Sequence, residues 1–525
     1  MPAVAEEGVH GDIPSRSGIY ASARSGRTLG MRLATILTLT AALLFSACGS
    51  GAADTGSSSA ATGSAAAAPT HGSALTDWPM FGLNPQRLDA TNRPTGITAA
   101  NVNSLRSRRV SLPGTVDSSP IYLHGARVRG GTHDVFVVTT TYGRTIAIDA
   151  GSGSLLWTFT PKSYGGLVGS DQVTTASPVA DPGGAFVYTA SPDGLVHKLA
   201  LASGHEVRRG SWPVRITKDP TREKIAAALN VDGPDVLATT GGYIGDAPTY
   251  QGHVVAIYRA SGHVDAVFNT LCARRRTIIV PSSCPESDSA ILSRGGAVVE
   301  PGGRRVLVST GNGAWDGHRY FGDSVLELNF PSLRRRQSFT PRNQAELNAN
   351  DTDLGSSAPA LLGHGRVMIA GKDGIIRVLS LARLNGHRPG TVRLGGETQT
   401  LPTPGGDLLF TQAAVWHHGQ ATTVFIADFS ATAAYKLRNG RLHKLWENDS
   451  AGTSPVFAGG LLYVYEPNDG GIEVYSPGSG TPIAHLPGAP GHWNSPIVVD
   501  GHIAEPEGDV NAHSGSGTLD LFSVR

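Results

Sequence analysis

The segment TIAIDAGSGSLLW, residues 145–157, decides the fold because it is the clearest copy of a pattern that repeats along the chain. A β-rich run ends at Asp149, a turn of glycine and serine reverses the chain, and a second run ends at Trp157. The unit opens upstream, where small residues are followed by Pro120. Repeats of this size indicate a radial or linear array rather than a series of unrelated domains.

Eight such units follow one another between residues 118 and 525, and they are recognised at residues 118, 176, 252, 295, 358, 413, 454 and 495. The chain contains 67 Gly and 33 Pro, which is typical of short strands joined by turns. A four-stranded sheet cannot bury both faces alone, but it can when packed radially against its neighbours. The sequence therefore predicts an all-β protein, an eight-bladed β-propeller of four-stranded blades.

Two local features complete this prediction. The stretch from Thr221 to Leu229 is rich in alanine and predicts a helix inserted between the second and third units. A closed ring needs one blade made from both ends of the chain, so we expect the strand from Leu519 to Val524 to pair with a segment that follows Trp78.

The N-terminal part divides into two regions before the repeats begin. Residues 1–48 comprise an upstream extension and a signal sequence, which we expect to start at Met31 and whose apolar stretch is too short to span a bilayer. Its end, Ser46-Ala47-Cys48, resembles a bacterial lipoprotein signal in which Cys48 is lipidated. Residues 49–76 are almost entirely Gly, Ala, Ser and Thr, which predicts a flexible tether, and residues 77–525 form the propeller.

Charge and cysteine content restrict the partners and the compartment. The formal net charge is +1, so nothing predicts a nucleic-acid partner. An exported protein can form disulfides, and with Cys48 assigned to lipid we expect Cys272 and Cys284 to pair. The protein is thus predicted to lie outside the cytoplasm, anchored by lipid to the outer face of a bacterial membrane.

The repeat in residues 147–157 resembles that of the pyrroloquinoline-quinone (PQQ) propeller superfamily, over roughly residues 77–525. In that superfamily the turn joins two strands, and the tryptophan docks on the neighbouring blade. The resemblance implies two kinds of function on one fold: PQQ- and calcium-dependent dehydrogenases of alcohols or sugars, and non-catalytic lipoproteins that scaffold outer-membrane protein assembly.

The resemblance also implies site residues if the chain is a dehydrogenase. Asn312, in the sequence Thr-Gly-Asn, matches a calcium ligand, and Asp353 matches the catalytic base, which also ligates calcium. Lys372 matches the residue that contacts the quinone. Asp246 matches a third calcium ligand only if the alignment is shifted by one residue. Arg294 occupies the position of the tryptophan floor beneath the quinone, where its guanidinium could stack.

Other roles for these residues remain open at this stage. Asn312 and Asp353 could tie loops together, as these residue types do in turns, and Lys372 could be an ordinary turn residue. The leading prediction is a binding or scaffold protein that needs no cofactor and meets other envelope proteins. The alternatives are the PQQ- and calcium-dependent dehydrogenase and a quinone-free ligand binder. A scaffold predicts an axis filled by side chains and an apolar patch on a rim, whereas an enzyme predicts an open axial cavity with a flat apolar wall.

Overall fold

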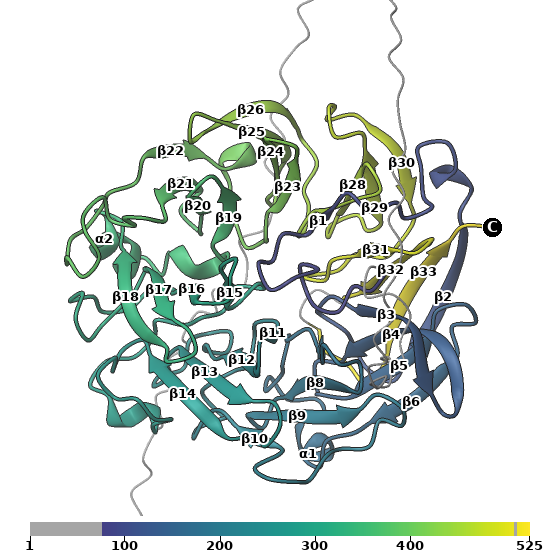
Figure 1. The fold of residues 1–525 in the computed structure, drawn as a ribbon, viewed down its shortest axis with the longest axis horizontal. Coiled ribbons are helices and arrows are strands. Elements are labelled where there is room, and N and C mark those ends of the chain that lie inside the picture. Colours follow the sequence, from purple (N-terminus) through teal and green to yellow (C-terminus); the bar gives the residue numbers. More distant parts are fainter. Residues whose placement is uncertain (1–75, 509–511) are drawn as a thin grey trace, which may run out of the picture. The chain divides into compact units, whose positions relative to one another are not determined.

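Eight blades, each an antiparallel sheet of four strands, follow one another around a common axis in the computed structural model, and blade 7 gains a fifth, parallel strand (Figure 1). The structure describes residues 76–508 and 512–525. The signal sequence, Cys48 and nearly all of the predicted tether lie outside these residues. The expected eight-bladed β-propeller is confirmed, and the strands of blades 1 to 7 follow chain order from the axis outward.

The first four blades have the following strands. Blade 1 contains β3 (Ile121–Val128), β4 (Gly131–Thr139), β5 (Thr145–Asp149) and β6 (Leu155–Phe159). Blade 2 contains β7 (Val179–Ala180), β8 (Phe186–Ser191), β9 (Leu195–Ala200) and β10 (Val214–Arg215). Blade 3 contains β11 (Asn230–Asp232), β12 (Asp235–Thr239), β13 (His253–Tyr258) and β14 (Val264–Asn269). Blade 4 contains β15 (Val298–Val299), β16 (Arg305–Ser309), β17 (Val325–Asn329) and β18 (Arg334–Phe339).

The remaining blades close the ring. Blade 5 contains β19 (Ala360–Gly363), β20 (Arg366–Ile369), β21 (Ile375–Ser380) and β22 (Gln399–Pro402). Blade 6 contains β23 (Ala414–His418), β24 (Ala421–Ala427), β25 (Thr432–Arg438) and β26 (Arg441–Asn448). Blade 7 contains β27 (Val456–Ala458), β28 (Leu461–Tyr465), β29 (Ile472–Tyr475) and β30 (Pro482–Leu486). Blade 8 contains β31 (Ile497–Val499), β32 (His502–Glu507), β33 (Gly517–Ser523) and β2 (Arg106–Leu112).

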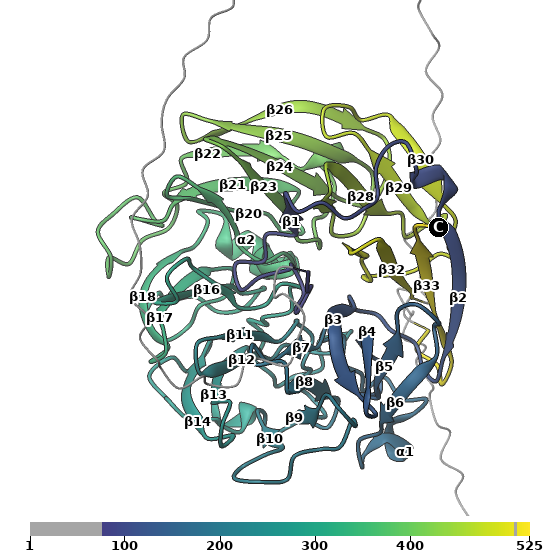
Figure 2. The same ribbon diagram turned by 45° about the vertical axis from the view of Figure 1, so that its right-hand side comes forward.

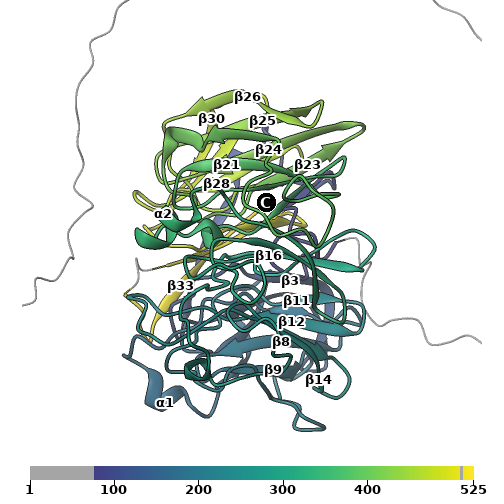
Figure 3. The ribbon, with the colours of Figure 1, turned by 90° about the vertical axis from the view of Figure 1, so that its left-hand side faces the viewer.

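Helices are few among the described residues. The short elements outside the blades are α1 (Tyr164–Leu167), α2 (Gln344–Ala349), η1 (Val102–Ser104), η2 (Pro281–Ser283), η3 (Leu354–Ser356) and η4 (Pro404–Gly406). The side view in Figure 3 places α1 at the edge of the blades, beyond β9. In the part of the chain that the structure describes, no helix is long and apolar enough to cross a membrane.

The repeated tryptophan links each of three blades to the next one. Trp157 donates its indole N–H to the carbonyl of Leu201 at 2.8 Å, and Trp212 and Trp446 make the same bond to Arg259 and Pro477. The ring of Trp157 also covers Gly204, where a Cβ would lie 2.6 Å from Cε3. Gly204 therefore makes room for the tryptophan of the preceding blade, and the docking of Trp157 on the neighbouring blade agrees with what the resemblance implied.

The apolar core lies between blades rather than at one centre. One cluster joins blades 1 and 2, for example, through Val137 and Leu199, and another joins blades 5 and 6 through Met368 and Val424. Each sheet thus buries its two faces against two neighbours, which is why the repeated units are stable only as a ring.

Ring closure pairs the two ends of the folded chain within blade 8. Strand β33 aligns antiparallel with β2, from Arg106 opposite Ser523 to Leu112 opposite Gly517. The expected C-terminal strand is confirmed, and its partner lies 28 residues after Trp78. The free edge that a repeat array otherwise exposes is covered in this way.

The predicted helix from Thr221 to Leu229 is wrong. This segment is irregular up to β11, and its backbone groups form hydrogen bonds with residues outside the segment. Lys224 exchanges two hydrogen bonds with Gly241, and Ala228 donates to the carbonyl of Arg294. Alanine-rich sequence favours a helix locally, but here these backbone groups are used by neighbouring blades.

An N-terminal segment, residues 77–91, crosses the axis and contacts the inner strands in turn (Figure 1). Trp78 pairs with Tyr122 of blade 1, and β1 (Ala90–Thr91) adds in parallel to β27 of blade 7. Figure 2 shows β1 between β23 and β28. In between, the fully buried Arg87 donates to four carbonyl oxygens, those of Phe81, Ala228, Leu229 and Gly295, at 2.6–3.2 Å. We call residues 77–91 the axial plug.

Candidate functional site

An axial cavity of about 650 Å³ lies beside the plug and is lined by residues from loops of several blades. All five residues that the sequence suggested for a cofactor site line it, namely Asp246, Arg294, Asn312, Asp353 and Lys372. They come from blades 3, 4 and 5 and are up to 126 residues apart in the chain, from position 246 to position 372. The fold thus brings the five together, while their roles stay predictions.

Asp353 is the most firmly held of the five. It precedes η3 and is almost fully buried. Its Oδ1 accepts the backbone N–H of Asn312 at 2.9 Å, and its Oδ2 lies 2.6 Å from Nζ of Lys372. Gly311 allows this approach, because a Cβ there would collide with Oδ1 of Asp353. The carboxylate is therefore fixed in orientation from two sides at the cavity wall.

Lys372 is the cationic partner of this carboxylate. Burial alone lowers the pKa of Lys372, but the charge of Asp353 and its hydrogen bond, together with the charges of Asp351 and Asp246, raise the pKa above its usual value. Its Nζ also donates to the backbone carbonyl of Asp351 at 3.3 Å. Lys372 therefore carries its positive charge at neutral pH.

Negative charge gathers around Asp353. Burial raises the pKa values of Asp246, Asp288 and Asp351, and the charge of Asp353 raises all three further. A hydrogen bond from the hydroxyl of Tyr250 to Asp246 Oδ1, 2.7 Å long, opposes this increase at Asp246. Carboxylates that hinder one another's ionisation favour a bound cation, and Lys372 supplies only one positive charge.

The other part of the cavity contains an ion-pair cluster. Arg294 pairs with Asp117 at 3.1 Å, and His492 contacts the second oxygen of the same carboxylate at 2.7 Å. Burial alone raises the pKa of Asp117, but the charges of Arg294 and His492 hold it well below its usual value. The guanidinium of Arg294 lies 5.7 Å from the ring centroid of Trp493.

A cluster of aromatic rings, which sequence reasoning missed, borders the cavity. Phe410 and Trp493 line it with ring centroids 4.7 Å apart, and Phe429 packs against both at 5.5 and 5.3 Å. No tryptophan is near Arg294 in sequence, but Trp493 is near in space. The sequence did offer one indication of these cavity residues, namely their position in the repeat. Phe410, Asp353 and Trp493 each lie just before the innermost strand of a blade, and these junctions surround the axis.

Lys224 is a second cavity residue that the sequence did not suggest. Burial and the nearby charge of Arg294 lower its pKa to about 8, although Asp117 opposes the decrease. Among the described residues its Nζ has no hydrogen-bond or ion-pair partner. Its charge is therefore available to a ligand.

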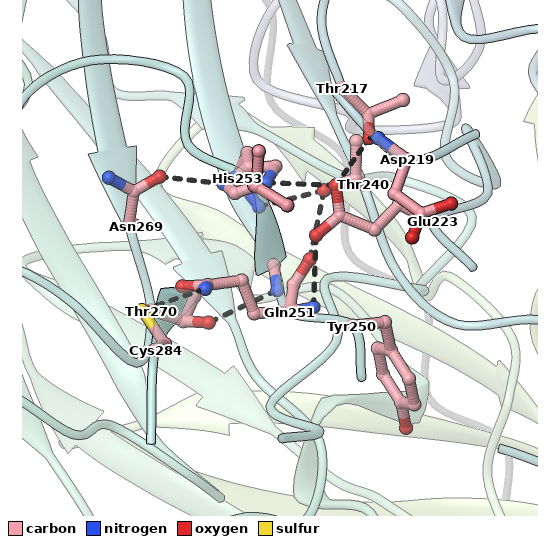
Figure 4. Close-up of polar contacts among 12 residues, drawn as sticks. Thr217, Asp219, Glu223, Thr240, Tyr250, Gln251, His253, Asn269, Thr270 and Cys284 are labelled. Carbon is pink, nitrogen blue, oxygen red and sulfur yellow. Dashed lines mark hydrogen bonds and ion pairs between the residues drawn. The ribbon is translucent and has the colours of Figure 1, made fainter. Parts of the chain in front are cut away.

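A buried polar network holds the segment that carries Lys224 (Figure 4). Glu223 Oε2 accepts from Thr217 and lies 3.0 Å from His253 Nε2, and both members of this pair are fully buried. The backbone N–H of Gln251 donates to Glu223 Oε1 at 3.2 Å. The network fixes Glu223, and it thereby positions the backbone from which the Lys224 side chain extends.

The same network reaches the disulfide. Cys272 and Cys284 are joined, as expected from the sequence. The side-chain amide of Gln251 donates to Cys284 Sγ at 3.2 Å (Figure 4). The disulfide loop thus supports the cavity wall indirectly, through Gln251 and Glu223.

Solved structures with similar folds include two dehydrogenases. A quinohemoprotein alcohol dehydrogenase from Comamonas testosteroni superposes with a TM-score of 0.62 at 15% identity, over 85% of this chain and 80% of that one. A europium-containing methanol dehydrogenase gives 0.61 at 14%, over 86% and 98%. The chain has the fold of the PQQ propellers.

The PQQ-propeller fold also includes a protein of another kind. BamB from Moraxella catarrhalis superposes with a TM-score of 0.50 at 13% identity, over 80% of this chain and 100% of that one. No protein-family model and no curated protein sequence matches this chain. At these identities the likeness shows the fold alone, so function has to be argued from the cavity.

Proposed function

We propose that the protein is a quinoprotein-type dehydrogenase that binds PQQ and a divalent cation in the axial cavity and oxidises an alcohol or sugar hydroxyl. The observation that carries this proposal is the convergence of Asp246, Asn312, Asp353 and Lys372 on one open cavity beside a cluster of aromatic rings. Open axial space suits the enzyme and the quinone-free ligand binder, and not the scaffold; the carboxylates and Lys372 beside the rings favour the enzyme. The scaffold function expected from the sequence stays a prediction.

The distribution of exposed apolar side chains supports the same choice. The large apolar side chains exposed among the described residues are distributed over blades 1, 3, 6 and 8 and the loops after blades 1 and 3: Leu155, Val168, Ile244, Tyr258, Val280, Leu445 and Val524. Scattered residues of this kind are normal on a monomer surface and do not indicate a protein interface.

The cavity residues fit the chemistry of PQQ. The cofactor is planar and carries carboxylates, so Trp493 and Phe410 offer it apolar ring surface, while Lys224 offers positive charge. The oxygen atoms of Asp246, Asn312 and Asp353 are the ligand type that Ca²⁺ prefers. A volume of about 650 Å³ lies within the usual range for small-ligand sites.

Asp353 is the residue placed to accept a proton. Its carboxylate, oriented by Asn312 and Lys372, would take the proton of the substrate hydroxyl as general base. Lys372, charged at neutral pH, would stabilise negative charge that develops beside it. When bound, PQQ supplies the two-electron acceptor for the hydrogen removed from the alcohol carbon.

Calorimetric titration of PQQ into the full-length chain, with Ca²⁺ present, tests this function. We expect stoichiometric binding that Lys372→Ala weakens by about tenfold or more, whereas Lys218→Ala, which removes an exposed lysine outside the cavity, leaves it unchanged. Asp353→Asn should keep PQQ binding and abolish dye-linked oxidation of alcohols and sugars. Absence of binding at about 50 µM PQQ would overturn the proposal.

We also propose that the protein acts outside the cytoplasm, held by a lipid on Cys48. The support is the sequence before residue 49 and the disulfide between Cys272 and Cys284, which suits an oxidising compartment. Radiolabelled palmitate should be incorporated into the wild-type chain but not into Cys48→Ser. Equal labelling of both proteins would contradict the anchor without affecting the cavity.

A further inference from the structure

A cluster of side chains of the types that bind metals lies outside the axial cavity, at the junction of blades 8 and 1. His124 is on β3, Asp134 is on β4, and Asp500 is in the turn between β31 and β32. Figures 1 and 2 both show β3 beside the strands of blade 8. The cluster therefore joins the first complete blade to the blade that closes the ring.

The three ligand atoms converge. His124 Nδ1 lies 3.0 Å from Asp134 Oδ1 and 3.0 Å from Asp500 Oδ2, and all three atoms lie within 4.8 Å of one another. One ring nitrogen carries at most one hydrogen, so it cannot donate a full hydrogen bond to both carboxylates. A cation at the centre of the three atoms would satisfy all of them.

Charge balance supports a cation at the same place. Within residues 76–508 and 512–525, no lysine or arginine lies within ion-pair distance of Asp134 or Asp500, and His124 is the basic group that both contact. A divalent ion would compensate these two carboxylates, which have no permanently charged partner. The site is open to solvent, since His124 and the two carboxylates are each 36–37% exposed.

Neighbouring groups hold the ligands in place. Tyr122 donates its hydroxyl to Asp500 Oδ2 at 2.8 Å, and the backbone N–H of Gly125 donates to Asp134 Oδ1 at 2.8 Å. Hydrogen bonds of this kind orient carboxylates that bind metals. The pair His133 and Asp149, on the same blade, has a similar contact of 2.7 Å but only one carboxylate.

We propose that His124, Asp134 and Asp500 bind a zinc-like divalent transition-metal ion, with water in the remaining position. One imidazole nitrogen and two carboxylate oxygens suit Zn²⁺, whereas Ca²⁺ and Mg²⁺ prefer oxygen ligands alone. The ion would connect blade 1 to blade 8 and thereby reinforce ring closure. This inference is independent of the proposed dehydrogenase function, because none of its residues lines the axial cavity.

Thermal unfolding and metal analysis of the full-length chain, purified without a histidine tag and treated with EDTA, test the site. At a Zn²⁺ concentration of about one hundred times Kd, we expect the midpoint of unfolding to rise by about 3 °C. One zinc per chain should remain after gel filtration. Ca²⁺ at the same concentration should give no increase through this site.

The variants assign the effect to these residues. His124→Ala and Asp500→Asn should lose both the bound zinc and the increase in midpoint, while His133→Ala should keep both. Asp353→Asn should also keep both, which separates this site from the axial cavity. Retention of zinc by His124→Ala, a stabilisation by Ca²⁺ that His124→Ala or Asp500→Asn removes, or absence of bound zinc in the wild-type chain would each overturn the proposal.

Discussion

The axial plug and the axial cavity each contain a buried cationic side chain, but the two cations have different surroundings. Arg87 in the plug donates to four carbonyl oxygens, including those of Ala228 and Gly295. Within two residues of those acceptors, Ala226 and Arg294 line the cavity, into which Lys224 also extends without a partner. The same inner loops thus supply three hydrogen-bond acceptors to one cation and leave another available. Hydrogen bonding, rather than charge alone, distinguishes a residue that stabilises the ring from one that is free to bind a ligand.

Arg87→Met should produce the largest effect, on stability. It leaves four buried carbonyl oxygens without their donor, and we expect a loss of about 3–5 kcal/mol in the free energy of unfolding. Chemical denaturation measures this loss, with Arg93→Met, an exposed arginine close to the plug, as the control. A loss equal to that of the control would remove the distinction between plug and cavity.

Glu223→Gln should have the next largest effect. The amide replaces a carboxylate that accepts from Thr217, His253 and the backbone of Gln251, so we expect a loss of about 2–4 kcal/mol. Glu346→Gln, on the exposed face of α2, is the matched control and should change stability by less than about 0.5 kcal/mol. Unfolding midpoints in denaturant measure both losses, and equal losses in Glu223→Gln and Glu346→Gln would show that the network does not stabilise the fold.

Lys224→Met should affect ligand binding more than stability. Removing a partly buried amine without a partner costs little stability, and we expect a change within about 1 kcal/mol. PQQ affinity should fall by about tenfold because an anionic group loses its partner. Chemical denaturation measures the change in stability, and calorimetry on the same preparation measures the PQQ affinity. A large loss of stability would show that Lys224, like Arg87, stabilises the fold.

The pH dependence of PQQ binding should be a smaller effect of the same residue. Because the pKa of Lys224 is lowered to about 8, the side chain is charged below that pH and neutral above it. Affinity should therefore be highest below pH 8 and fall by up to about tenfold as the pH rises to about 9. Calorimetry across this range should show the decrease in the wild-type chain and a flatter profile in Lys224→Met.

The blades were predictable from sequence because each repeat carries its own strands, turn and tryptophan, as at Asp149 and Trp157. The segment 221–229 was not, because its backbone bonds go to Gly241, Ser177 and Arg294, which no local window contains. Much of the candidate site was accessible through family-like motifs around Asn312 and Asp353. Trp493 was not, because its nearness to Arg294 depends on closing a ring between blades far apart in the chain.

Ring closure also sets an order of assembly. Strand β2 comes before the eight blades begin, whereas its partner β33 comes after every other blade strand in the chain. Because synthesis proceeds from the N-terminus, the edge of β2 stays unpaired until all other strands have been made. His492 and Trp493, which complete the cavity wall, also emerge late. A nascent chain that has not yet reached blade 8 therefore lacks a finished pocket, so ligand binding reports that the ring has closed.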